Sequence, residues 1–306
     1  MVVVFGTVCL DRLRRVERLP EKGGYAEILD EVEQIGGEAA NSAVGLQKWA
    51  CEVKLSSNPI GAGPWADLIR HKLSEVGLCD ERVPEGEAVT PFCDIYVTPD
   101  GERTMFGRGF LEMEQHTDPG LGPFVKGSWF TADPNPGKAS RDAMNLAAST
   151  GMKTYYLDFV RADDRIISGS GSAFWQSSTD WVGVRGNTQK NIQFAQRWVA
   201  KHSCFAILSD GPNGFVAGSP EMPVRAFPPY PCPELVDSTG AGDIFRAGML
   251  FGLSQNWDIA DCLRFASAAG CLNCLGLGAS SKIPSKEEIQ ELIRANPSVS
   301  RQYASG

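Results

Sequence analysis

Residues 235–243, Leu235-Val-Asp-Ser-Thr-Gly-Ala-Gly-Asp243, decide the fold class of this 306-residue chain. They join an extended apolar lead-in to a long apolar helix, predicted over Ala241–Gln255, through three residues without bulk, Gly240, Ala241 and Gly242. Glycine lets the backbone turn so that successive N–H groups face one point, and the start of the helix adds a partial positive charge. The stretch therefore predicts an anion-binding turn in an α/β fold.

The carboxylate of Asp243 follows in the first turn of the predicted helix. It has the wrong charge for simple phosphate binding, but it is suited to taking a proton from a hydroxyl nucleophile. The turn and the carboxylate together suggest phosphoryl transfer to an alcohol. The simpler alternative is that Gly240 and Gly242 only permit a tight turn and that Asp243 caps the helix.

Two other segments favour the ligand-binding interpretation. Ile35-Gly36-Gly37-Glu-Ala-Ala-Asn41 is a second glycine turn, which opens a helix predicted over Ala39–Cys51 and carries an amide side chain at the same end. Asp11 follows the predicted first strand, Val2–Phe5, and we expect it just past the end of that strand. The carboxyl edge of the sheet is where α/β folds place ligands.

Short apolar runs alternate with amphipathic stretches along the chain, which is the pattern of βαβ units and a largely parallel sheet. Further strands are predicted at Val53–Ser57, Ser128–Ala132, Tyr155–Phe159, Asp180–Val184 and Phe205–Ser209. Further helices are predicted at Pro64–Val76, Lys138–Ser149, Lys190–His202, Asp258–Cys274 and Ser285–Ala295.

One region breaks this alternation. Val89–Val97 and Arg103–Phe106 flank the turn Pro99-Asp-Gly101, which is hairpin chemistry rather than a crossover helix. A similar extended stretch, Tyr25–Ile35, lies early in the chain. We expect the two stretches to pair into a small separate sheet.

Composition narrows the class of protein. Hydrophobic residues at 42% and charged residues at 22% are globular values. The net charge is −8 and no five-residue basic cluster occurs, so a nucleic-acid partner is not expected. No apolar run reaches the roughly 18 residues of a membrane helix, and no basic leader precedes the first strand, so we expect a cytoplasmic protein without a membrane partner.

The nine cysteines are an odd number spread along a long chain, and we interpret them as reduced, buried thiols. Cys271-Leu-Asn-Cys274 has the C-x-x-C spacing, but no second pair lies at zinc spacing. We therefore interpret this pair as helix packing rather than as a metal site.

Taken together, these motifs resemble the ribokinase family, also called PfkB carbohydrate kinases, over nearly the whole chain. Its two signature regions correspond to Gly36-Gly37…Asn41 and Asp237–Asp243, and its early sugar-binding aspartate falls on Asp11. Lys282-Ile-Pro284 matches the ending before its last helix. The resemblance implies a three-layer α/β/α ribokinase-like core with a small β-sheet lid.

The resemblance also implies one kinase domain over residues 1–306, with lid segments at about 12–35 and 86–110. ATP is the implied donor, Mg²⁺ the implied helper, and a sugar or sugar-derived alcohol the implied acceptor. The catalytic group would be Asp243 as general base, with the amides of Gly240, Ala241 and Gly242 as an anion hole. Acceptor binding is assigned to Asp11, Gly36, Gly37, Asn41 and Arg103, and nucleotide binding to Asn187, Lys190, Ser209, Gly211 and Thr239.

Two positions depart from the family pattern. The Asn-x-x-Glu motif that organises Mg²⁺ and phosphate falls on Asn187-Thr-Gln-Lys190, so a base replaces the acid. Lys190 would either contact phosphate in place of part of the metal's role or weaken metal use. Cys9 stands where ribose-specific members carry an amide, which argues against ribose as the acceptor.

Two alternatives remain open at this point. One is a nucleoside kinase of the same fold, for which Phe92, Tyr96 and Phe106 would supply an aromatic platform in the lid. The other is a non-catalytic relative that binds sugar or nucleotide. Because a lid sheet has an open edge, the resemblance also suggests a homodimer through the lid.

Overall fold

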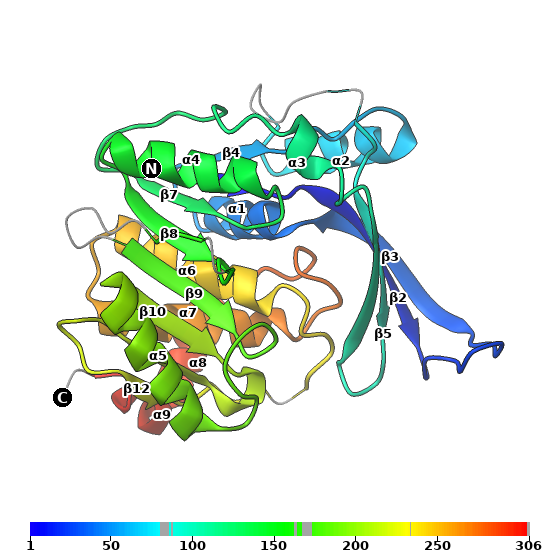
Figure 1. Ribbon diagram of the computed structural model, residues 1–306. Helices are drawn as coiled ribbons and strands as arrows, with labels where there is room; N and C mark the ends of the chain where they lie inside the picture. Colours follow the sequence, from blue (N-terminus) through cyan, green and yellow to red (C-terminus); the bar gives the residue numbers. More distant parts are fainter. Residues whose placement is uncertain (80–85, 87, 162–163, 167–172, 233, 305–306) are drawn as a thin grey trace.

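Two β-sheets organise the chain, a large one in its α/β body and a small one beside it (Figure 1). This is a computed structural model, and it describes residues 1–79, 86, 88–161, 164–166, 173–232 and 234–304. The large sheet contains β1 (Val2–Gly6), β4 (Val53–Ser57), β7 (Trp129–Ala132), β8 (Lys153–Leu157), β9 (Ala173–Ser178), β10 (Phe205–Ser209), β11 (Phe215–Gly218) and β12 (Arg225–Phe227). Their order across the sheet is β12-β11-β10-β9-β8-β7-β1-β4.

Both faces of the large sheet are buried. Six neighbouring strands pair in parallel, in the order β4, β1, β7, β8, β9 and β10. At the β10 edge, β11 and β12 add antiparallel strands. Along β1, Val2 and Val4 join one hydrophobic cluster, whereas Val3 and Phe5 join another. Because successive side chains of a strand point to opposite faces, each face has its own core. The predicted three-layer α/β/α core with a largely parallel sheet is confirmed.

Helices cover the two faces. They are α1 (Glu38–Lys48), α2 (Pro64–Glu75), α3 (Met113–His116), α4 (Lys138–Ser149), α5 (Thr188–His202), α6 (Ala241–Ser254), α7 (Ile259–Asn273), α8 (Lys286–Ala295) and α9 (Pro297–Arg301), with a 3-10 turn, η1, at Gly211–Asn213. Helices α1, α6 and α7 contribute to the cluster of Val2 and Val4, and α4 and α5 to that of Val3 and Phe5. In the described ranges, no helix combines the length and apolar character of a membrane span.

The small sheet has the order β3-β2-β5-β6, formed by β2 (Cys9–Val16), β3 (Ile28–Gly36), β5 (Phe92–Val97) and β6 (Arg103–Arg108). Its inner face packs Leu13, Ile95 and Val97 against Leu277 of the α/β body. The two extended stretches do lie in one sheet, but β2 separates them. Residue 87, inside the second predicted lid segment, lies outside the described residues.

Two sequence predictions about strands are wrong. The strand expected at Asp180–Val184 is instead a turn, in which the N–H groups of Trp181 and Val182 both donate to the Ser178 carbonyl at 3.1 Å. The strand of that unit is β9, where Gln176 and Ser177 weaken the apolar signal although both are buried. Asp11 is also not just past β1, because it lies inside β2, which follows β1 too closely to be told apart from it in the sequence.

Candidate active site

Asp243 lies at the centre of a group of polar side chains where α1 and α6 begin. It is 7% exposed, and Asn41 Nδ2 donates to Asp243 Oδ2 at 2.8 Å. Ser42 Oγ donates to the Asp243 carbonyl oxygen at 3.0 Å. These bonds hold together two helix starts that are 202 residues apart in sequence. The structure therefore brings the predicted base and a predicted acceptor residue into direct contact.

Arg246, in the next turn of α6, is fully buried. Its Nε donates to Ser42 Oγ at 2.8 Å, and its Nη2 donates to the Glu38 carbonyl oxygen. Nη2 also lies 3.9 Å from Asp243 Oδ1. The guanidinium favours the charged form of four acids, whose pKa values desolvation raises: Glu38, Asp133, Asp158 and Asp243. Arg246 thus stabilises a site that is otherwise strongly acidic.

The pKa of Asp243 is raised to about 6, chiefly because burial disfavours the carboxylate. The positive charge of Arg246 and the hydrogen bond from Asn41 act in the opposite direction. At pH 7 such a carboxyl is mainly ionised, yet it accepts a proton more readily than an exposed aspartate. This is the protonation behaviour that a general base requires.

The two glycines of the anion-binding turn have different structural roles. Gly240 caps α6 with φ +75°, and a Cβ there would lie 2.0 Å from Ala279 Cβ. At Gly242 the backbone is helical and exposed, and a Cβ would meet a single atom within 4 Å, Gln176 Nε2 at 3.9 Å. Packing explains the first glycine but not the second. Gly242 is therefore the position where close approach of a ligand is the better explanation.

Asp237 stabilises the segment that leads into the anion-binding turn through three hydrogen bonds. Its Oδ1 accepts from the Thr239 N–H at 2.9 Å and from Thr239 Oγ1 at 2.7 Å, and its Oδ2 accepts from the Gly278 N–H at 2.8 Å. The predicted nucleotide residue Thr239 therefore has its hydroxyl engaged within the loop.

Of the predicted acceptor residues of the first signature, Gly36 lies against Asp11 and Gly37 lies against Thr7. Gly36 lies opposite Cys9 on the neighbouring strand, and a Cβ at Gly36 would lie 2.0 Å from Asp11 Cγ. Gly37 has φ +95° and abuts the Thr7 carbonyl, where a Cβ would come within 2.3 Å of the oxygen. Because Gly36 and Gly37 have no side chain, the Asp11 carboxyl and the start of α1 have the space that they occupy.

Asp11 itself is buried, and its pKa is raised to about 7 by burial and, further, by the charges of Asp243 and Asp237. Cys9 Sγ donates to Asp11 Oδ1 at 3.4 Å and acts in the opposite direction. This coupling shows that Asp11 shares the electrostatic environment of Asp243. No hydrogen bond is recorded between those two carboxyls in the described part of the chain.

Arg103 connects the small sheet to the anion-binding turn. Its Nη1 donates to Ser238 Oγ at 2.8 Å, and Ser238 Oγ donates to the Gly101 carbonyl at 3.3 Å. Gly101 also approaches Leu235, since a Cβ at Gly101 would lie 2.8 Å from Leu235 Cδ2. The β5–β6 hairpin therefore rests on residues 235–238, and Arg103 is placed at the turn rather than beside Asp11.

The predicted nucleotide residues lie on neighbouring elements. Ser209 ends β10, Gly211 opens η1 with open space at its Cβ position, and Asn187 caps α5 by accepting from the Lys190 N–H at 3.0 Å. The Lys190 side chain is exposed. Asp210 joins this group, because its carboxylate accepts from the Gly186 N–H at 2.9 Å.

Gln176 links the residues around Asp243 to the predicted nucleotide residues, and it was not predicted from the sequence. Its Nε2 donates to the Gly242 carbonyl at 2.9 Å, and Ser209 Oγ donates to the carbonyl of the next residue, Ser177, at 3.3 Å. It was missed because the strand that carries it, β9, was placed at Asp180–Val184 instead.

A simple signal could have identified further residues. Asp133, Asp158 and Asp210 each come directly after a parallel strand, β7, β8 and β10. This is the carboxyl edge of the sheet, where α/β folds gather polar residues. The rule holds for these three aspartates and fails for Asp11, which lies inside β2.

The described side chains do not fit a resident Mg²⁺ site. Across the described ranges, no three His, Cys, Asp or Glu side chains are arranged to hold a metal ion. Both oxygens of Asp237 are occupied by N–H donors, and Lys190 offers no oxygen where the family has an acid. No step proposed below passes through a metal held by the protein.

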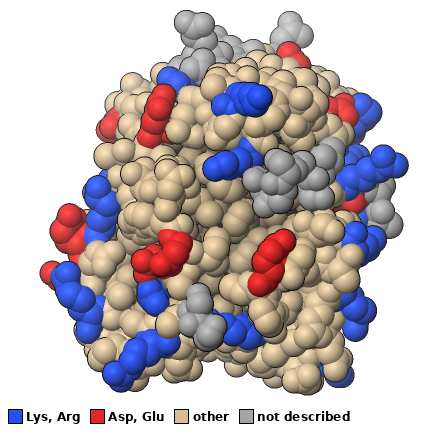
Figure 2. All heavy atoms as spheres, turned by 90° about the vertical axis from the view of Figure 1, so that its left-hand side faces the viewer, with Lys and Arg blue, Asp and Glu red and all other residues tan. Residues whose placement is uncertain are grey.

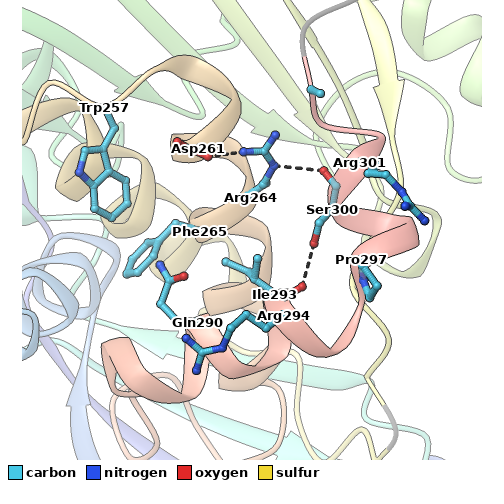
Figure 3. Close-up of a pocket in the computed structure, with 11 residues that line it drawn as sticks. Trp257, Asp261, Arg264, Phe265, Gln290, Ile293, Arg294, Pro297, Ser300 and Arg301 are labelled. Atoms are coloured by element: carbon cyan, nitrogen blue, oxygen red, sulfur yellow. Dashed lines mark hydrogen bonds and ion pairs between the residues drawn. The ribbon is translucent and has the colours of Figure 1, made fainter.

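A hollow lies away from these residues, between α7, α8 and α9 (Figure 3). It is a cavity of about 570 Å³, with Trp257 and Phe265 on one side. Its Arg264 is already engaged, by Asp261 and by the Ser300 carbonyl at 3.1 Å. None of the predicted site residues lines it.

Positive charge near the candidate active site comes from Arg246, Arg103 and the amides that open α6. Figure 2 shows Lys and Arg side chains interspersed with Asp and Glu on the face opposite the small sheet. For a chain of net charge −8, an anion is therefore better accommodated by the local groups of the site than by that outer face.

Comparison with known proteins gives one consistent result. A family model described as pfkB family carbohydrate kinase matches residues 1–286. An uncharacterized sugar kinase of Dictyostelium discoideum is 29% identical over 350 residues, which cover 96% of this chain and 98% of that protein.

Solved structures share the fold at low sequence identity. A ribokinase of Cryptococcus neoformans in complex with ADP superimposes with a TM-score of 0.79 at 16% identity, covering 95% of this chain and 98% of that one. A nucleoside kinase of Burkholderia thailandensis in complex with inosine superimposes with a TM-score of 0.75 at 17% identity, covering 96% and 97%. These similarities confirm the expected ribokinase-like fold.

Replacing the buried Arg246 tests the electrostatics of the site. In Arg246→Met the four acids lose their compensating charge, so the free energy of unfolding should fall by about 3–5 kcal/mol. Because Arg246 lowers the pKa of Asp243, that pKa should rise above 6 in the variant. Urea unfolding and an NMR titration of the Asp243 carboxyl measure the two effects.

The matched control is Arg264→Met on α7. Arg264 forms a partly exposed ion pair with Asp261, so its replacement should lower the free energy of unfolding by less than about 1 kcal/mol. An equal fall in the free energy of unfolding in the two variants, or an unchanged pKa of Asp243 in Arg246→Met, would contradict this account of Arg246.

Proposed function

The chain belongs to the pfkB family of carbohydrate kinases, and from that premise we propose that it transfers the γ-phosphoryl group of ATP to a hydroxyl of a sugar or sugar-derived small molecule, with Asp243 as general base. The single observation that carries this proposal is the position of Asp243. It is a buried carboxyl of pKa about 6, in the first turn of a helix whose backbone is exposed at the neighbouring Gly242.

The proposed step uses the residues of the chain as follows. Asp11 and Asn41 hold acceptor hydroxyls, and Asn41 also orients Asp243 through its 2.8 Å hydrogen bond. Asp243 accepts the proton of the attacking hydroxyl. The hydroxyl oxygen attacks the γ-phosphorus in line and ADP leaves, while the Gly240, Ala241 and Gly242 amides stabilise charge on the transferred group. Gln176 holds the Gly242 peptide in place during this step.

The nucleotide is proposed to lie along Ser209, Gly211 and Thr239, with Asn187 and Lys190 at the start of α5. The ADP complex of the Cryptococcus neoformans ribokinase supports the choice of nucleotide. Mg²⁺ would enter with the nucleotide and supply charge neutralisation through phosphate oxygens. Lys190 would add a positive charge near the phosphates.

A sugar-like acceptor is favoured over a nucleoside by the small sheet. Residues paired across strands share a face, and Asp11 pairs with Cys93. Phe92, Tyr96 and Phe106 belong to the opposite face, since Phe106 pairs with Asp94. There Arg12 lies over Phe92 at 5.5 Å and Tyr96 contacts Phe106. These rings offer no platform for a base beside Asp11.

We also propose that residues 1–306 form one kinase domain, and that the segments at 12–35 and 86–110 act as a lid over the acceptor. The contacts of Arg103 and Gly101 with residues 235–238 support this assignment. A lid that closes on the turn would exclude water, which competes with the acceptor as nucleophile.

The function is tested first at Asp243. Asp243→Asn should lower kcat about 10²–10⁴-fold while nucleotide binding persists, because only the proton acceptor is lost. In the unmodified enzyme, kcat/KM should fall as the pH falls through about 6, where the base becomes protonated. ATP consumption over a panel of sugars, sugar acids and nucleosides identifies the acceptor. Near-normal turnover in the variant contradicts the role of Asp243, and binding without turnover by any acceptor favours a non-catalytic relative.

The two glycines of the turn form a matched pair of tests. Gly242→Ala should keep or slightly raise stability, since alanine is a better helix former by roughly 0.5–1 kcal/mol, yet lower kcat/KM at least about tenfold. Gly240→Ala should lose stability, because its φ is +75° and its Cβ would meet Ala279. If Gly242→Ala had normal kinetics, an anion hole at that amide would be excluded.

Lys190 is tested by its effect on nucleotide affinity. Lys190→Ala should raise the KM for ATP about 3–10-fold with little change in stability, because the side chain is exposed and its backbone N–H makes the cap. Arg197→Ala, also exposed on α5, serves as the control. An unchanged KM would show that Lys190 makes no phosphate contact.

The small sheet is the proposed surface of a homodimer. Its edge strands expose Leu29, 53% exposed, and Phe106, 61% exposed. Sedimentation equilibrium should therefore give about twice the chain mass of 33.1 kDa, and Phe106→Asp should lower it to one chain. A monomeric parent protein at micromolar concentration would refute this surface.

A further inference from the structure

Three cysteines lie together at the C-terminal end of α7. Cys271 is in the last turn of that helix, Cys274 is its C-cap, and Cys232 comes from the proline-rich segment that follows β12. Cys232 Sγ lies 3.8 Å from the Cys271 carbonyl, and Cys271 Sγ donates to the Pro231 carbonyl at 3.3 Å. The two side chains are also near enough for the charge of Cys232 to raise the pKa of Cys271. Two residues 39 positions apart thus lie against each other through these sulfur–carbonyl contacts.

This cluster adjoins the segment that leads to the anion-binding turn. The Cys274 carbonyl accepts from the N–H groups of Val236 and Asp237, at 2.9 and 3.2 Å. Asp237 in turn orients Thr239. Cys232 is only four residues before Val236 in the chain, so a covalent bond at Cys232 would fix both ends of this short segment on α7.

We propose that Cys232 and Cys271 are a thiol-modification site, which forms an intramolecular disulfide by exchange with a low-molecular-weight disulfide such as oxidised glutathione. The inference rests on the sulfur–carbonyl contacts that bring Cys232 and Cys271 together, and on the hydrogen bonds of the neighbouring Cys274 carbonyl to residues 236–237. It does not depend on the proposed phosphoryl transfer.

The exposure of the three thiols sets the order of the exchange. Cys232 is exposed, whereas Cys271 and Cys274 are partly buried and their pKa values are raised by desolvation. Because the thiolate is the attacking species, Cys232 reacts first. Its sulfur displaces one glutathione thiolate and forms a mixed disulfide.

Cys271 completes the reaction. Its thiolate attacks the Cys232 sulfur of the mixed disulfide and releases the second glutathione. In total, two protein thiols are oxidised, one disulfide is reduced to two thiols, and the two protein protons pass to the glutathione thiolates. The charge of Cys232, one cause that raises the pKa of Cys271, is absent once Cys232 is in the mixed disulfide.

The experiment treats the full chain with oxidised glutathione and counts free thiols. We expect the loss of two thiols with no retained glutathione, and a non-reducing peptide map that joins Cys232 to Cys271. A disulfide that closes a loop between two residues 39 positions apart should raise Tm by about 5 °C or more. Hydrogen exchange at the Val236 and Asp237 amides should slow, and dithiothreitol should reverse all four changes.

Cys232→Ser should abolish the disulfide and the rise in Tm, whereas Cys79→Ser, at another exposed cysteine, should leave both unchanged. A stable glutathione adduct on Cys232 with Cys271 still free would overturn the proposal. So would a Cys271–Cys274 disulfide. Since every readout is independent of turnover, an inactive protein that forms the bond would refute the proposed function and leave this site intact.

Discussion

The burial of one carboxylate between two helix starts is the constraint on which the site depends. Asp243 is removed from water, and burial raises its pKa and so disfavours the carboxylate. The Asn41 amide and the Arg246 guanidinium restore its ionised form, and both need α1 and α6 to begin at the same place. Gly37 and Gly240 make those beginnings possible, because each adopts a positive φ that other residues avoid.

The same constraint explains how an acidic chain can handle a phosphoryl group. Favourable potential comes from backbone amides at the start of α6 and from Arg246 and Arg103, rather than from a basic outer face. The cost is a high density of buried charge. Arg246 has to offset several acids at once, so the geometry of its contacts with Ser42 and Glu38 matters as much as its charge.

Much of the fold was predictable because its signals are local. β4, β10 and α4 coincide with the predicted ranges, since each is a continuous apolar or amphipathic run between turn residues. β9 was not predictable in this way, because its polar residues Gln176 and Ser177 are buried by tertiary contacts that no local pattern encodes. Asp11 was misplaced for a similar reason: β1 and β2 are separated by two residues, so one apolar run contains strands of two different sheets.

The sequence by itself determined the two glycine turns, the helices that they open, and Asp243 in the first turn of one of them. These follow from backbone preferences that act within a few residues. Only the tertiary structure decided that Asn41 donates to Asp243 across 202 residues, that Gln176 holds Gly242, and that Cys232 meets Cys271. Such contacts depend on which elements become neighbours in the sheet and its covering layers, and that is set by burial of the whole core rather than by any local segment.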